Sequence, residues 1–289
     1  MMNESYQIAV IGGGIAGQAA ALTAKSLRLK LLWLGEGYGK ADSAEYVRNY
    51  PAFTGNGAAL AEALEKQRAA EGLVLTFARV DGVYKSADGF LLTAGKRTFS
   101  AQTVVLATGV EASGVIAGER EFLGRGVSYC AVCDGALYRG KEIAVVLGNA
   151  KFSDEVEYLA GFASTVYCVC RGFEGNFRAK NIKTVKDTPL AVIGEQRVSG
   201  LKLSQSELTV DGVFFLKNSA PPEALVGGLE TDGAFVRVTR DCATNLKGLF
   251  AAGDITGTPY QFAKAAGEGL VAVYSARAYL NTLDKKNGE

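Results

Sequence analysis

The chain has 289 residues, a formal net charge of +1 and no histidine. A length about twice that of a typical domain predicts two domains, and a charge so close to zero argues against binding to nucleic acid or to a membrane surface. The lack of histidine excludes Ser-His-Asp and Cys-His catalysis and every imidazole metal site, so acid–base chemistry must fall to carboxylates, thiols, lysine or tyrosine.

The N-terminal part of the sequence predicts a βαβ unit. An apolar run over 6–11 ends at three consecutive glycines, an alanine-rich segment over 15–27 has helical spacing, and a second apolar run covers 29–34. The uncharged stretch 5–24 is long enough to suggest a membrane span, but its glycines and its β-like beginning favour strand, turn and helix. We therefore expect a cytoplasmic protein.

The loop of this unit carries the G-x-G-x-x-G pattern, formed by Gly12, Gly14 and Gly17. The first glycine permits a tight turn, the second lets the backbone approach a pyrophosphate, and the third allows close packing of helix on strand. Glu36 follows at the distance at which an acidic residue meets a ribose hydroxyl. The alternatives are a glycine-rich turn without a ligand and a solvated carboxylate, but the strand–loop–helix context favours dinucleotide binding.

The rest of the sequence predicts a second nucleotide-binding-type domain. A second βαβ pattern begins near Glu142, which indicates two related α/β domains. The expected elements, in chain order, are a helix over 58–72, antiparallel strands over 73–100, a strand over 103–106, strands over 143–147 and 165–170 around a helix over 153–162, a buried strand over 249–252 and a closing helix over 261–280.

Cys130 and Cys133 form the sharpest motif, because they are the only cysteines spaced as C-x-x-C. Two cysteines at this spacing can close a small ring that electrons reopen, and Asp134 is placed to move the proton that accompanies thiol–disulfide exchange. The alternatives are two structural thiols or half of a zinc site, which two further cysteines on an apolar strand complete poorly. We interpret the remaining cysteines as core or surface residues: Cys168, Cys170 and Cys242.

With these motifs the chain resembles the low-molecular-weight thioredoxin reductases nearly from end to end. The resemblance implies an α/β fold of two Rossmann-like, three-layer ββα domains. In it, an FAD-binding domain over 1–112 and 239–289 carries an inserted dithiol domain over 113–238. The segments that match are Gly12 to Gly17, Asn49-Tyr50-Pro51, Ala107-Thr108-Gly109, Tyr129 to Gly135, Asp211 to Phe214, Gly248 to Asp254 and Ala265 to Gly269.

The resemblance also implies the site residues, a homodimer and thioredoxin as the partner. Cys130, Cys133 and Asp134 are the expected catalytic residues, with Cys133 closest to the flavin. No metal ligand is implied. The expected FAD-binding residues are Gly12, Gly14, Ile15, Ala16, Gly17, Glu36, Asn49, Ala107, Thr108, Gly109, Gly253, Asp254, Gln261, Phe262 and Ala263.

The second glycine loop, which binds NADPH in this family, is lost. Leu147 disfavours the positive φ of the turn, Asn149 hinders approach to a pyrophosphate, and Phe152 collides with close helix–strand packing. Three further family segments are altered: His-Arg-Arg reads Cys170-Arg171-Gly172, Ile-Gly reads Leu216-Lys217-Asn218, and the arginine of Arg-Gln-Ala is Tyr260.

This pattern resembles the ferredoxin-dependent flavin thioredoxin reductases, which share the fold and lack NADPH motifs. It implies electron transfer from ferredoxin through FAD and the dithiol to thioredoxin. The alternatives are a dithiol oxidase that uses oxygen, a reductase with another donor and a non-catalytic redox sensor. A cluster of cations is either a docking patch for an acidic ferredoxin or an ordinary solvated loop: Arg171, Arg178, Lys180, Lys183 and Lys186.

Overall fold

The computed structural model describes residues 5–42, 44–110, 115–170, 176–217 and 220–287. Unit 1 comprises Met1–Val110 and Pro221–Glu289, and unit 2 comprises Glu111–Ala220. The chain therefore returns to unit 1 at Pro221, earlier than the expected boundary at 239. The reason is that apolar residues of this stretch, among them Leu225 and Val236, belong to the core of unit 1. The short elements here are α5 (Pro222–Leu225), β17 (Thr231–Asp232) and β18 (Phe235–Val236).

Unit 1 is built on a seven-stranded sheet with the order β5-β2-β1-β8-β7-β6, and β19 pairs with β8 beside this path. The strands β1, β2, β5, β8 and β19 run parallel, whereas β6 and β7 continue the sheet as an antiparallel hairpin. The bounds are β1 (Ser5–Ile11), β2 (Leu31–Gly35), β5 (Thr76–Phe77), β6 (Gly82–Ser86), β7 (Gly89–Ala94), β8 (Arg97–Leu106) and β19 (Leu249–Ala251).

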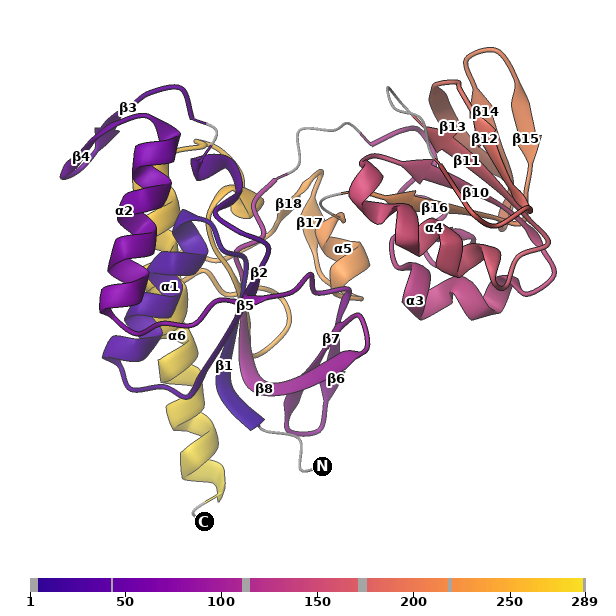
Figure 1. Ribbon diagram of the computed structural model, residues 1–289. Helices are drawn as coiled ribbons and strands as arrows, with labels where there is room; N and C mark the ends of the chain where they lie inside the picture. The colour runs from indigo at the N-terminus through magenta and orange to yellow at the C-terminus, as the bar shows by residue number, and fades with distance from the viewer. Residues whose placement is uncertain (1–4, 43, 111–114, 171–175, 218–219, 288–289) are drawn as a thin grey trace. The chain divides into compact units, whose positions relative to one another are not determined.

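The central strand β1 is buried on both faces. Ile8 and Val10 face one apolar cluster, and Ala9 and Ile11 face the other. A parallel strand covered on both sides reads as a continuous apolar run, which is the pattern seen in the sequence. Three helices cover the first face (Figure 1): α1 (Ile15–Ser26), α2 (Gly57–Ala70) and α6 (Phe262–Asn287). Unit 1 also contains the hairpin β3 (Val47–Tyr50) and β4 (Phe53–Gly55) and the 3-10 turns η1 (Gly39–Ala41) and η4 (Asp254–Thr256).

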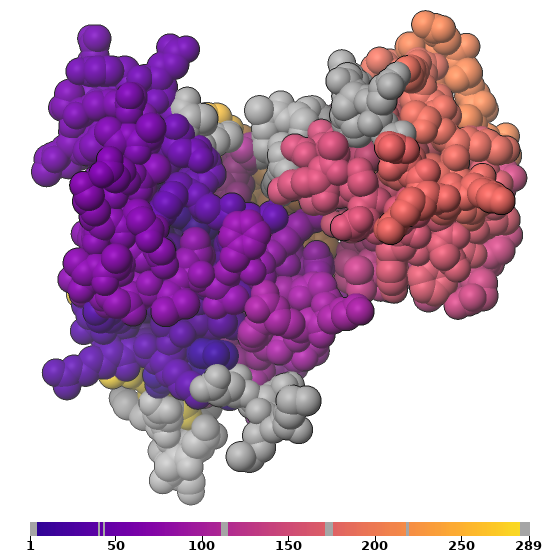
Figure 2. Space-filling model, viewed as in Figure 1, coloured from indigo at the N-terminus to yellow at the C-terminus, as the bar shows by residue number. Residues whose placement is uncertain are grey.

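Unit 2 repeats the architecture on a smaller scale. Its parallel sheet has the order β12-β11-β10-β16-β9, and an antiparallel meander has the order β13-β14-β15. These residues form a continuous packed body, coloured from magenta to orange in Figure 2. The bounds are β9 (Val127–Ser128), β10 (Glu142–Leu147), β11 (Thr165–Cys170), β12 (Ile182–Val185), β13 (Pro189–Gly194), β14 (Val198–Leu203), β15 (Glu207–Thr209), β16 (Gly212–Leu216), α3 (Ala131–Asp134), η2 (Gly135–Tyr138), η3 (Ala150–Phe152) and α4 (Ser153–Ala160).

The predicted α/β class with two Rossmann-like domains is thus confirmed. Most expected strands and helices occur within two residues of their expected ends. Three expectations differ: β5 pairs in parallel with β2 although antiparallel strands were expected over 73–100, the strand expected over 103–106 begins at Arg97 as β8, and α6 extends to Asn287. The uncharged stretch 5–24 forms β1, the glycine loop and most of α1. Within the described parts of the chain, no helix has both the length and the apolar character needed to cross a membrane.

Candidate active site

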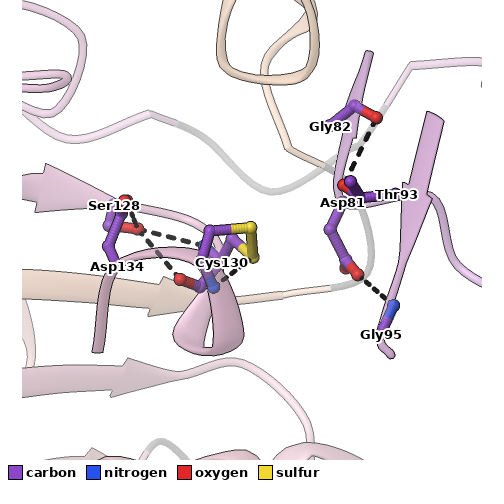
Figure 3. Close-up of a disulfide and its surroundings, with 8 residues drawn as sticks. Asp81, Gly82, Thr93, Gly95, Ser128, Cys130 and Asp134 are labelled. Carbon is purple, nitrogen blue, oxygen red and sulfur yellow. Dashed lines mark hydrogen bonds between the residues drawn. A yellow bond between two sulfur atoms is a disulfide. The ribbon is translucent and has the colours of Figure 1, made fainter. Parts of the chain in front are cut away.

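Cys130 and Cys133 form a disulfide at the start of α3 (Figure 3). Their Cα atoms are 5.3 Å apart, which is within the usual range for a disulfide. Cys130 is the N-cap of α3, and its Sγ accepts a hydrogen bond of 3.1 Å from the Cys133 backbone N–H. The disulfide follows β9, an edge strand of the parallel sheet, and Cys133 is exposed. It is therefore accessible to a second disulfide.

Asp134 is held by a neighbour that the sequence did not indicate. The Ser128 hydroxyl donates a hydrogen bond of 2.6 Å to Asp134 Oδ2, and the Cys130 backbone N–H donates one of 3.1 Å to Ser128 Oγ. Ser128 is buried, so this arrangement fixes the carboxylate beside the dithiol. Burial, and then the Asp134 charge, raises the pKa of the nearby Tyr138 phenol.

The first glycine loop has the close packing that its pattern predicts. A Cβ on Gly12 would lie 2.1 Å from Ala107 O, and one on Gly17 would lie 1.9 Å from Gly12 O. A Cβ on Gly14 would meet only Tyr38 O, at 3.6 Å. Two glycines are therefore required by the fold, while Gly14 leaves space in front of the helix.

The N-terminus of α1 is suited to an anion. Its N-cap Gly14 contributes no side-chain hydrogen bond, and its first turn, which contains Ile15 and Ala16, has no acidic residue. The first backbone N–H groups of a helix have no partner within the helix, and the helix dipole favours negative charge there. A pyrophosphate therefore fits this position.

Several expected cofactor residues come together around the loop. The Gly12 contact places Ala107 and Thr108 against it, and Gly109, which follows them, has a positive φ of 69°. Glu36 directly follows Gly35, whose own Cβ would lie 2.7 Å from Gly13 N.

The turn before α6, which begins at Gly253, packs against the start of α1 beside the first glycine loop. A Cβ on Gly253 would lie 2.8 Å from the Ala16 Cβ. The Lys264 ammonium donates hydrogen bonds of 2.8 Å to Gly253 O and Gly257 O, which fixes the turn that carries Asp254. Lys264 was not predicted, since a lysine at the start of a helix has no distinct pattern.

Asn49 and Gln261 lie together although they are far apart in the chain. Asn49 Nδ2 donates a hydrogen bond of 2.6 Å to Gln261 Oε1. Next to them, the Tyr50 and Phe262 rings meet edge to face with centroids 6.2 Å apart, and Ala263 is exposed in the first turn of α6. The structure thus groups these four expected cofactor residues: Asn49, Gln261, Phe262 and Ala263.

The second loop is filled by side chains. Leu147 and Phe152 are buried in the core of unit 2, and the Asn149 side chain accepts a hydrogen bond of 3.0 Å from the Lys151 backbone N–H. The first turn of α4 contains Asp154 and Glu155. The Asn149 amide oxygen therefore engages the Lys151 backbone N–H, a donor that could otherwise face a phosphate. The two carboxylates of the first turn oppose a further negative charge at the start of α4.

The three remaining cysteines, Cys168, Cys170 and Cys242, are buried and form no disulfide. Cys168 Sγ and Cys170 Sγ are 3.4 Å apart inside unit 2. Burial, followed by the neighbouring Cys170, raises the pKa of Cys168 well above its usual range, so this thiol is a poor nucleophile. Among the described residues, no group of three or more cysteine, aspartate or glutamate side chains is arranged to hold a metal ion.

The candidate docking cations are exposed, with one outside the described residues. Lys183 lies on the edge strand β12, and its ammonium is 5.3 Å from the centroid of the Tyr167 ring. The residue outside the described parts is Arg171. The role of this patch stays a prediction. Its exposed members are Arg178, Lys180, Lys183 and Lys186.

Comparisons with known proteins agree with this geometry. The pyridine nucleotide-disulphide oxidoreductase family matches residues 6–269. A thioredoxin reductase of Treponema pallidum is 33% identical over 98% of this chain and 99% of its own.

Solved structures give the same result. A ferredoxin-flavin thioredoxin reductase from Clostridium acetobutylicum is 40% identical, covers 96% of this chain and 99% of its own, and has a TM-score of 0.87. An atypical thioredoxin reductase from Desulfovibrio vulgaris Hildenborough is 28% identical, with coverage of 96% and 98% and a TM-score of 0.72. The chain therefore belongs to the pyridine nucleotide-disulphide oxidoreductase family, within which it is a homologue of the thioredoxin reductases.

Proposed function

We propose that the protein is an FAD-dependent thioredoxin-disulfide reductase that receives electrons from reduced ferredoxin and does not use NADPH. The observation that carries this proposal is the contrast between the two loops. Unit 1 offers a helix start without a side-chain cap or acidic residue, whereas unit 2 has Asn149, Asp154 and Glu155 at the corresponding place. Similarity to a ferredoxin-flavin thioredoxin reductase supports the choice of donor.

Unit 1 would hold the FAD. The backbone N–H groups after Gly14 face its pyrophosphate, Glu36 meets a ribose hydroxyl, and Gly253-Asp254 contacts the ribityl–phosphate region, with Asn49 and Gln261 near the ring system. When bound, FAD accepts electrons one or two at a time and so joins a one-electron carrier to a two-electron disulfide. The rest of the proposed FAD site would be lined by Ile15, Ala16 and Ala107 to Gly109.

The dithiol of unit 2 carries out the disulfide exchange. Two electrons and two protons convert the Cys130–Cys133 disulfide into two thiols, and Asp134, oriented by Ser128, moves a proton. One cysteine then attacks the thioredoxin disulfide as a thiolate, and the other resolves the mixed disulfide. This step leaves thioredoxin reduced and the enzyme disulfide restored.

The overall transfer is favourable without a nicotinamide. Plant-type ferredoxins have potentials near about −400 mV, and thioredoxin lies near about −270 mV. A two-electron drop of ~130 mV releases roughly 6 kcal/mol. The proposal also includes the homodimer that the resemblance implies and the cytoplasmic location expected from the sequence.

Anaerobic flavin bleaching tests the donor. The FAD-loaded protein is mixed with NADPH, with NADH, or with enzymatically reduced ferredoxin and oxidised thioredoxin, and thioredoxin thiols are counted. We expect no bleaching by either nucleotide and ferredoxin-dependent formation of thiols. Rapid bleaching by NADPH would overturn the interpretation of Leu147, Asn149 and Phe152. Peroxide formation from a dithiol substrate in air would indicate the oxidase instead.

A further inference from the structure

Unit 2 contains a buried carboxylate that the proposed chemistry does not use. The Glu119 residue is only 1% exposed. Its Oε1 accepts hydrogen bonds from the Lys217 ammonium, at 2.6 Å, and from the Tyr129 hydroxyl. Its Oε2 accepts one of 2.9 Å from the Ile116 backbone N–H. A buried charge with this many partners is fully compensated.

Lys217 fills the space at the end of β16. Its side chain is 11% exposed, and its ammonium lies 5.5 Å from the centroids of the Tyr129 and Phe215 rings. A Cβ on Gly148 would lie 3.1 Å from the Lys217 Cβ. Lys217 therefore stands directly beside the altered second loop, at one of the positions where the sequence departs from the NADPH-using relatives.

The ion pair joins three segments of unit 2. Glu119 comes soon after the chain enters the unit, Lys217 comes just before it leaves, and Tyr129 directly precedes Cys130. The first segment is itself anchored, because the Val192 backbone N–H donates a hydrogen bond of 2.8 Å to Ala117 O. Tyr129 is thus held at its hydroxyl by Glu119 and at its ring by Lys217.

We propose that Glu119 and Lys217 are positioning residues for the dithiol, and that their buried ion pair holds the Tyr129–Cys130 segment in the geometry needed for exchange with a second disulfide. This role rests on the proposed disulfide exchange but is independent of the electron donor. Losing one partner leaves the other buried and uncompensated, so the local structure must rearrange around it. The rearrangement reaches Cys130 through the adjacent peptide.

The test measures exchange with chemically reduced enzyme. The full-length protein is reduced with dithiothreitol, freed of excess reagent under anaerobic conditions, and mixed with oxidised thioredoxin in a stopped-flow instrument. We expect Lys217→Met to lower the second-order rate constant about tenfold, within the roughly two- to 150-fold range that coupling in such a network spans. Lys217→Arg, which retains the cation, should stay within about threefold of the wild type.

A double variant separates positioning from packing. Glu119→Gln combined with Lys217→Met removes both charges. The new amide can accept from the Ile116 backbone N–H with its oxygen and donate to the Tyr129 hydroxyl oxygen with its NH2 group. We expect its rate constant to return to within about threefold of the wild type. The control is Lys66→Met, which breaks an exposed lysine–glutamate pair with Glu62 and should change nothing.

Two results would overturn the positioning role of Glu119 and Lys217. A merely structural role would lower the melting temperature of Lys217→Met but leave its rate constant unchanged when measured well below that temperature, and this result would overturn the proposal. A double variant as slow as the single one would also overturn it. If the reduced wild-type enzyme transfers no electrons to thioredoxin, the proposed function itself fails, and the positioning role with it.

Discussion

The two βαβ units of the protein differ mainly in the few residues between strand and helix. In unit 1, β1 is followed by glycines that let α1 pack within van der Waals distance of the loop, and the start of α1 has no side-chain cap or acidic residue. In unit 2, β10 is followed by Asn149, which caps the next turn, and by Phe152, which enters the core. The same fold thus presents one helix start without a side-chain cap and one loop filled by side chains.

Under the proposed function, the helix start, more than the sheet, distinguishes a loop that binds a nucleotide from one that does not. Both units retain parallel strands on each side of the loop, with β1 between β2 and β8 and β10 between β11 and β16. The fold alone therefore does not establish a ligand. The second loop differs from the first by the Asn149 cap, the buried Phe152 ring and the acidic first turn of α4, which opposes negative charge at the helix start.

The largest effect is expected from Gly17→Ala in the first loop. Its Cβ would lie 1.9 Å from Gly12 O. Ordinary overpacking of a core costs about 1–3 kcal/mol, and this clash with the backbone is more severe. We expect loss of bound flavin, measured as the ratio of flavin absorbance to protein, together with a lower unfolding midpoint in urea.

Gly148→Ala is the matched variant in the second loop. Its Cβ would lie 3.1 Å from the Lys217 Cβ, a contact that a shift of a few tenths of an ångström relieves. We expect flavin content and unfolding midpoint close to the wild type. Equal loss of flavin in both variants would mean that the two loops are not as different as described.

Phe152→Ala should give the next largest change. Phe152 is buried among Val156 and Leu159 in unit 2, and truncation of a buried phenylalanine lowers the free energy of unfolding by about 3–5 kcal/mol. Urea unfolding measures this loss, and the flavin content of the folded protein should be unchanged. A loss below about 1 kcal/mol would show that Phe152 is not part of the core of unit 2.

The sequence predicted the elements whose function depends on a local pattern. The glycine loop, the C-x-x-C pair and the loss of the second loop are read from residue types at fixed spacing, and the structure places most of these residues in contact. Asn49 and Gln261 were expected from the resemblance alone, and their hydrogen bond links residues more than 200 positions apart.

Residues that act through tertiary contact were missed. Ser128 orients Asp134 and Glu119 pairs with Lys217, but a serine, a glutamate and a lysine carry no pattern until the fold brings them together. The boundary at Pro221 was missed because α5, β17 and β18 are too short for periodicity to be recognised.

A smaller loss of stability is expected when either of two asparagine caps, Asn149 or Asn56, is removed. Asn149 Oδ1 accepts from the Lys151 backbone N–H in unit 2, and Asn56 Oδ1 accepts from the Ala59 backbone N–H at the start of α2 in unit 1. Replacing such a cap by alanine typically costs about 1 kcal/mol. We expect this loss for Asn149→Ala and for Asn56→Ala, measured by thermal unfolding. No loss for Asn149→Ala alone would argue that its amide leaves the Lys151 donor available to a ligand.

A last comparison concerns the buried thiol of unit 1, Cys242, and the dithiol of unit 2. Burial, and then the charge of Glu268, raise the pKa of Cys242 to about 11. Because the folded-state pKa lies above the unfolded value, this thiol contributes stability in full below the unfolded pKa. The contribution is lost as the pH rises toward about 11.

Stability measured at rising pH therefore tests the Cys242 assignment. Between pH ~9 and ~11 the wild type should lose more stability than Cys242→Ala, because Cys242 ionises on unfolding only in the wild type, while the other cysteines are the same in both proteins. In the reduced protein at neutral pH, Cys130 and Cys133 should react with a thiol reagent much faster than the buried cysteines. Rapid labelling of Cys242 in the folded protein would contradict both expectations. It would mean that this thiol is accessible to solvent in the folded state, whereas both expectations rest on its burial.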